Sequence, residues 1–120
     1  MTSDEARKQL YRAMEAIKSA TGENWEVDAE PGLLGCSRTH SQWHTSWKGS
    51  PTADRESSYA AVRDALEDAG FTTYILGPRS TTPSVGSQTE GGGGLVFSIP
   101  VEGGPIGFNV SSDCFPEDEE

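Results

Sequence analysis

The stretch 95-LVFSIPVEGGPIGFNV-110 decides the fold class of this 120-residue chain. Apolar residues occupy every second position on both sides of a turn segment, Glu102-Gly103-Gly104-Pro105. A period of two residues is typical of a strand that buries one face, and Gly and Pro favour a turn. The stretch therefore predicts an antiparallel β-hairpin. Its buried face would consist of Leu95, Phe97, Ile99, Val101, Ile106, Phe108 and Val110.

Two upstream segments predict amphipathic helices. Thr2 and Glu5 have the spacing of a capping box, which marks the start of the first helix. The second helix is expected to begin at Thr52 or Asp54, after the break at Gly49-Ser50-Pro51. The inner faces, defined by helical spacing, are Ala6, Leu10, Ala13, Met14 and Ile17 in the first helix, which Gly22 would end, and Tyr59, Val62, Leu66 and Ala69 in the second, which Gly70 would end.

The rest of the chain predicts three more strands and two loops. A short strand is expected around Trp25 and Val27, a longer one with a period of two over residues 39–47, and a third over residues 71–76. Residues 29–38 are rich in turn formers. Residues 77–94 are dense in Gly, Ser, Thr and Pro, which predicts a long flexible loop.

The order of these elements, α-β-β-α-β-β-β, predicts an α+β domain. Two helices would pack on one face of an antiparallel sheet, giving a sandwich of two layers. We expect this single domain to cover residues 1–115 and an acidic tail to follow at residues 116–120. Hydrophobic residues make up 33% of the chain, so the core is modest and a covalent cross-link would help it.

The charge balance excludes two classes of partner. The chain has 9 basic and 19 acidic residues, a net charge of −10, and its last basic residue is Arg79. Phosphate backbones and anionic membranes repel such a surface, so no nucleic-acid partner is expected. An acidic surface serves solubility or attracts a basic protein. No run approaches the ~18 apolar residues of a membrane-spanning helix.

The stretch 31-PGLLGCSRTHSQWHTSW-47 admits several interpretations. Leu33-Leu34-Gly35-Cys36 has the local pattern of a lipobox, but acids rather than a hydrophobic segment precede it. Cys36, His40 and His44 are spaced by four. On a strand at about 3.3 Å per residue, the two histidines would lie ~13 Å apart, too far to share a metal ion. A thiol nucleophile at Cys36 has no recognisable local signature.

A disulfide between Cys36 and Cys114 is the interpretation that this elimination leaves. If the last strand continues beyond Val110, Cys114 lies an even number of residues from the buried Ile106, Phe108 and Val110, and its side chain points into the core with theirs. The bridge would close a loop of about 78 residues, worth on the order of 4.5 kcal/mol by the chain-entropy account. Two cysteines in an acidic chain rich in Gly, Ser and Thr fit an oxidising compartment.

The motifs of common catalytic and cofactor sites are missing from the sequence. There is no P-loop, no Gly-x-Ser-x-Gly elbow and no His-Glu-x-x-His. The run from Gly91 to Gly94 leads into a strand rather than a helix, so it lacks the geometry that holds a phosphate. It is better explained as a flexible arm. We therefore expect no enzyme activity, no cofactor and no metal.

The most promising binding residues lie on the strand over residues 39–47. Its odd positions place Trp43 and Trp47 on one face, and its even positions place His40 and His44 on the other. The two tryptophans could be core residues under the helices. Alternatively they form an exposed aromatic strip, because aromatic side chains dominate interface hot spots. The 77–94 loop is a second candidate.

Several short motifs resemble those of small exported lipoproteins of actinobacteria. In these proteins a leading helix is followed by a Trp strand, a Gly-Cys pair, a second Trp strand and a Ser-x-Cys near the C-terminus. The matching residues are Trp25, Gly35-Cys36, Trp43 or Trp47, and Ser112-Asp113-Cys114. The resemblance spans most of the chain. It implies a domain tethered outside the membrane through a lipidated cysteine upstream of residue 1.

These observations predict a secreted or surface-tethered, non-catalytic domain that binds a protein or a cell-envelope component. The charged first helix is not a signal peptide, so export requires a leader that has been removed, with Met1 in its place. One alternative is an acidic immunity or inhibitor protein that neutralises a basic toxin or enzyme. Another is a small thiol-dependent hydrolase, which requires a free Cys36.

Overall fold

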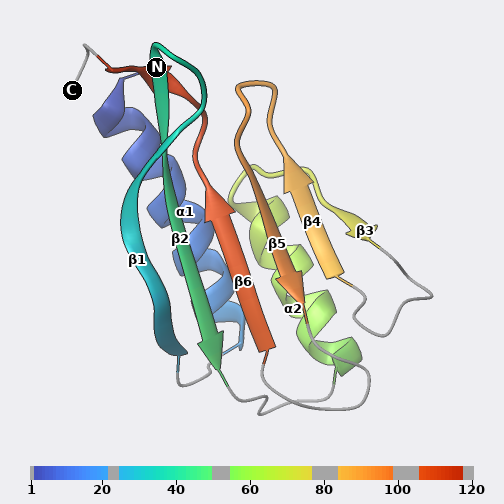
Figure 1. The fold of residues 1–120 in the computed structure, drawn as a ribbon. Helices are drawn as coiled ribbons and strands as arrows, with labels where there is room; N and C mark the ends of the chain where they lie inside the picture. The colour runs from blue at the N-terminus through green and yellow to red at the C-terminus, as the bar shows by residue number, and fades with distance from the viewer. Residues whose placement is uncertain (1, 22–24, 50–54, 77–83, 99–105, 118–120) are drawn as a thin grey trace.

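The structure, a computed structural model, describes residues 2–21, 25–49, 55–76, 84–98 and 106–117 (Figure 1). Two helices and a single sheet make up this described part of the chain. In chain order the elements are α1 (Ser3–Thr21), β1 (Trp25–Gly35), β2 (His40–Gly49), α2 (Arg55–Asp68), β3 (Tyr74–Leu76), β4 (Ser84–Gln88), β5 (Gly94–Ser98), β6 (Ile106–Ser111) and β7 (Phe115–Pro116).

The sheet is antiparallel throughout its described pairings. Its strand order is β1-β2-β6-β5-β4-β3, and the short β7 pairs with the start of β2. The strand pairing of the predicted hairpin is confirmed, because β5 pairs with β6 with Leu95 opposite Val110 and Phe97 opposite Phe108. Its predicted turn at residues 102–105, with Ile99 and Val101, lies outside the described residues. Both helices lie behind the sheet in Figure 1, so they cover one face, and neither described helix lies on the other, which is called the open face. The predicted α+β architecture is therefore correct.

Helix α1 begins and packs as its sequence predicts. The backbone N–H of Thr2 donates to Glu5 Oε1 at 3.0 Å, and the N–H of Glu5 donates to Thr2 Oγ1 at 3.2 Å, which is a reciprocal capping box. The five predicted inner residues, Ala6, Leu10, Ala13, Met14 and Ile17, are all buried. Part of the chain's hydrophobic core, which includes Phe97 and Phe108, lies between this stripe and the sheet.

Gly70 ends the second helix as predicted. Its φ of 96° lies in the left-handed region that favours glycine. The N–H of Phe71 then returns to Leu66 O at 2.9 Å, which closes the helix end. Phe71 is thereby buried in the core before β3 begins at Tyr74, so the strand is shorter than the predicted 71–76. The predicted caps at Thr52 and Asp54, and the stop at Gly22, lie outside the described residues.

The predicted loop over residues 29–38 is wrong for most of its length. Strand β1 continues to Gly35, and it pairs with β2 across two register shifts, one after Val27 and one after Ala29. The second shift covers Pro31, whose missing N–H is tolerated at a bulge on an edge strand. Bulges and proline were the features that made this segment resemble a loop.

The predicted flexible loop over residues 77–94 is also wrong in its second half. Residues Ser84–Gln88 form β4, which pairs with β5 on one side and β3 on the other. The sequence gives no sign of this strand, because it does not alternate apolar with polar residues. Its small residues Ser84, Gly86 and Ser87 are nevertheless buried. Of the predicted tail, Pro116 belongs to β7 and the N–H of Glu117 donates to Thr39 O, and residues 118–120 lie outside the described residues.

Candidate binding face

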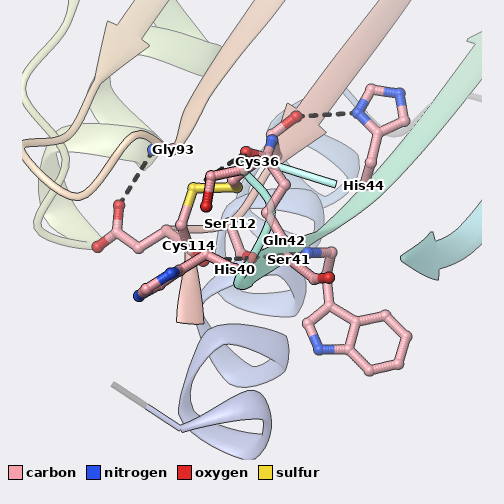
Figure 2. Close-up of a disulfide and its surroundings, with 12 residues drawn as sticks. Cys36, His40, Ser41, Gln42, His44, Gly93, Ser112 and Cys114 are labelled. Atoms are coloured by element: carbon pink, nitrogen blue, oxygen red, sulfur yellow. Dashed lines mark hydrogen bonds between the residues drawn. A yellow bond between two sulfur atoms is a disulfide. The ribbon is translucent and has the colours of Figure 1, made fainter. Parts of the chain in front are cut away.

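Cys36 and Cys114 form the predicted disulfide (Figure 2). Their Cα atoms lie 6.3 Å apart, and the bridge joins the β1–β2 connection to the segment after β6. Cys36 is exposed and Cys114 is half-buried, so the expectation that Cys114 points into the core is wrong. Strand β6 ends at Ser111, and the parity argument does not extend past that end. The thiol-hydrolase alternative requires a free Cys36, whereas the structure places Cys36 in this bridge.

The segment after β6 also holds the turn between β4 and β5. Asp113 accepts hydrogen bonds from Thr89 Oγ1 and, at 3.2 Å, from the N–H of Gly93. Gln9 on α1 donates to the same carboxylate at 3.1 Å and accepts from the Asp113 N–H at 2.6 Å. The carboxylate thus ties this turn to the first helix.

The glycine run packs closely against this segment. A Cβ at Gly91 would lie 2.6 Å from Asp113 Cγ, and one at Gly93 would lie 2.8 Å from the Asp113 backbone nitrogen. Gly92 adopts a φ of 93°, and its Cβ would approach Cys114 Sγ to 3.1 Å. The expected flexible arm is therefore a tight, packed turn, because the Asp113 side chain at Gly91, the Cys114 side chain at Gly92 and the backbone at Gly93 leave little space for a Cβ.

Trp43 and Trp47 lie on the helix-facing side of the sheet. Both are half-buried and pack against the core. Arg7 lies over the Trp43 ring, 5.5 Å from its centroid, and Lys18 lies over Trp47 at 3.6 Å, which are cation–π contacts from α1. The Trp43 indole N–H also donates to Ser3 O at 3.1 Å. The expectation that the two tryptophans form an exposed strip is therefore wrong, and the alternative, that they pack against the core under the helices, agrees with these contacts.

The even positions of β2 lie on the opposite, open face. Residues paired across an antiparallel sheet point to the same side, so the register defines rows of side chains on this face. One row runs His44, Ser111, Gly94 and Gln88, across β2, β6, β5 and β4. The next row runs Ser46, Asn109, Val96, Gly86 and Tyr74, and it reaches the far edge at β3.

These rows enclose an open hollow with a volume of about 390 Å³. The hollow forms because Gly94 places no side chain between Ser111 and Gln88. Its described lining carries no charged residue, although the chain has a net charge of −10. The lining consists of Gln42, Tyr74, Ser87, Gln88, Gly92, Gly93, Gly94, Leu95, Val96, Asn109 and Ser111.

The disulfide and the glycine turn border one end of the hollow. The side-chain amide of Gln42 faces the disulfide, with its Oε1 position 2.8 Å from Cys36 Sγ and 3.4 Å from Cys114 Sγ. A disulfide sulfur carries no hydrogen, so a hydrogen bond there requires the amide NH₂ to donate to it. Gly92 and Gly93 supply the adjacent lining, and Asp113 holds their turn in place. Gln42 and the turn are therefore positioned before any ligand arrives.

The two predicted histidines differ in their relation to the hollow. His44 borders it, because its Nδ1 lies 2.9 Å from the hydroxyl of Ser111 (Figure 2). His40 lies nearer the end of the sheet, where it pairs with Pro116 and its Nδ1 contacts Thr39 Oγ1 at 2.8 Å. No carboxylate in the described part of the chain bonds to the His44 ring. Among the described residues, the Ser111–His44 pair therefore has no acidic third member of a catalytic triad.

Sequence reasoning missed most of the lining. Asn109 and Ser111 alternate with the buried residues of β6, so their outward direction was available from the hairpin pattern. Gln88 and Tyr74 had no such signal, because β4 was not recognised and β3 was given no pairing partner. Within the described residues, no three His, Cys, Asp or Glu side chains gather as metal ligands would, and no helix there is long and apolar enough to cross a membrane.

Comparison with known proteins identifies a distant structural neighbour. The structure is similar to that of a DUF4853 family protein from Actinomyces odontolyticus, with a TM-score of 0.61 and 13% sequence identity. The similarity covers 96% of this chain and 68% of that one. No protein-family model matches the sequence, and no curated protein matches it either. The two chains therefore share a fold.

Proposed function

We propose that this chain is an extracytoplasmic, non-catalytic binding domain that recognises a cell-envelope component through the open face of its sheet. The observation that carries the proposal is the hollow of about 390 Å³ on a face that neither described helix covers. Small-molecule and cofactor sites are concave and occupy roughly 300–1,000 Å³.

The disulfide supports the location outside the cytoplasm. A bridge such as Cys36–Cys114 persists in oxidising compartments and is rare in the cytosol. The shared fold with a protein from Actinomyces is in keeping with the actinobacterial resemblance of the sequence motifs. Secretion, or tethering through a lipidated cysteine upstream of residue 1, forms part of this proposal.

The test is co-sedimentation of the oxidised, purified domain with insoluble actinobacterial cell envelopes. Tyr74→Ala removes an aromatic ring from the open face. The matched control, Ile75→Ala, truncates the next residue of β3, whose side chain points to the other face and has a similar exposure, 44% against 37%. We expect Tyr74→Ala to weaken sedimentation and Ile75→Ala to leave it unchanged. Absence of sedimentation, or equal loss in both variants, would contradict the proposal.

The salt dependence of binding in the same assay distinguishes the proposed open-face recognition from the acidic-inhibitor alternative. Affinity that comes from the net charge of −10 falls steeply when salt screens it. Contacts made by the uncharged lining depend little on salt. Retention of binding between about 50 and 500 mM salt therefore supports the open face, and a steep loss supports an electrostatic partner.

A further inference from the structure

We propose that the hollow on the open face binds an uncharged saccharide segment of a glycan. This inference rests on the proposed function and names the chemical class of its ligand. It follows from the three kinds of group that line the hollow, which are carboxamides, hydroxyls and a small apolar surface. Each kind has a matching feature on a neutral sugar ring.

The carboxamides provide the polar recognition. Gln42, Gln88 and Asn109 each present an NH₂ donor and a carbonyl acceptor in one plane. A sugar hydroxyl both donates and accepts, so neighbouring hydroxyls can satisfy both ends of one amide. Ser111 adds a hydroxyl whose oxygen is already held 2.9 Å from His44 Nδ1, which limits its rotation. These groups come from three strands, so they converge on the hollow from different sides.

The apolar part of the lining suits the C–H face of a sugar ring. Val96 and Tyr74 lie in one row across the sheet, with Gly86 between them. Both side chains line the hollow, so the Tyr74 ring and Val96 can contact one flat ligand together. An aromatic ring combines apolar area with a polar end, and Tyr74 is 37% exposed without a ligand.

Other ligand classes fit the lining less well. Anions would meet no Lys or Arg in the described lining and would be repelled by the net charge of −10. Cations would find no carboxylate there. An extended peptide binds by adding a strand to a free edge, whereas the hollow lies over β5 and β6, whose backbones are paired on both sides. An uncharged, hydroxyl-rich ligand remains.

The experiment is a titration of the isotope-labelled, oxidised domain followed by heteronuclear NMR. The probes are neutral oligosaccharides: a galactan, a mannan, a glucan and a chitin oligomer. A galacturonan oligomer is the matched control, because it resembles the galactan but carries a carboxylate on each ring. We expect at least one neutral oligomer to shift the side-chain amide signals of Gln42, Gln88 and Asn109 saturably, and the galacturonan to shift them far less.

Variants then assign the contacts. Asn109→Ala and Gln88→Ala should each weaken the affinity roughly 2- to 12-fold, the loss of one hydrogen bond to a neutral ligand. Both side chains are exposed, so the variants should fold. The control Ile75→Ala should bind as the wild type does. A pattern in which all three variants weaken binding equally would overturn the assignment of the ligand to the hollow.

The outcomes distinguish this inference from the function on which it rests. If no neutral oligomer shifts these signals, or the galacturonan shifts them equally, the saccharide inference is wrong. If cell envelopes nevertheless sediment the wild type but not Tyr74→Ala, the open face still binds a partner and that partner is of another class. If oligomers bind but envelopes do not, the hollow is a saccharide site and the envelope proposal fails.

Discussion

Replacement of Gly93 by alanine would test whether the glycine turn is packed or free. A Cβ at this position would lie 2.8 Å from both Asp113 N and Ser112 C. Carbon contacts normally lie at about 3.5–4.0 Å, so the turn or the segment must move by roughly 0.7 Å or more. The segment cannot move easily. Ser112 N–H donates to Trp43 O at 2.8 Å, and Asp113 N–H donates to Gln9 Oε1 at 2.6 Å.

The expected cost of Gly93→Ala is about 2–3 kcal/mol of unfolding free energy, in the upper part of the range for overpacking because backbone must shift. Urea unfolding, followed by tryptophan fluorescence, should show a midpoint about 1 M lower, since m is typically 1–3 kcal/mol/M. Gly35→Ala is the control, because nothing lies within 4 Å of its Cβ. If the two variants differ by less than about 0.5 kcal/mol, the turn is not packed and the flexible-arm prediction returns.

Two further perturbations probe the cross-link and the first helix. The double variant Cys36→Ala/Cys114→Ala opens a loop spanning 78 residues, so we expect a loss of about 4.5 kcal/mol in urea unfolding; a loss below about 1 kcal/mol would contradict the chain-entropy account. Hydrogen bonds from the backbone and then the side chain of Thr2 lower the pKa of Glu5. The folded pKa therefore lies below the unfolded one, so this stabilisation is present above the unfolded pKa and is lost on acidification. The difference in Tm between wild type and Glu5→Ala should shrink as the pH falls below ~4, and a difference independent of pH would refute the capping role.

The helices and the central hairpin were predictable because their signals are local. The inner residues of α1 recur at helical spacing, and the capping pair of Thr2 and Glu5 lies within one turn. The alternation in β5 and β6 likewise follows from neighbours along the chain. Strand β4 was not predicted, because its residues are small and are buried only when β3 and β5 pair beside it.

The hollow depends on tertiary structure in a stronger sense. Gln42, Gln88 and Asn109 are distant in sequence, and strand register alone brings their amides to one place. The packing of the glycine run could not be predicted either. A run of glycines indicates a flexible segment, and only the structure shows that the segment at Asp113 lies against Gly91 and Gly93. Exposure of a ring such as Trp43 depended in the same way on which face of the sheet α1 covers.

The sequence by itself determined the two helices, the central hairpin, the α+β class and the pairing of its two cysteines. Periodicity, capping and parity act over a few residues, and a chain with two cysteines has one intramolecular pairing available. The tertiary structure alone decided which face of the sheet stays open, where the hollow lies and why four glycines stand in a row. Those features arise from contacts between segments far apart in the chain, and burial and register exist only once the segments have packed together.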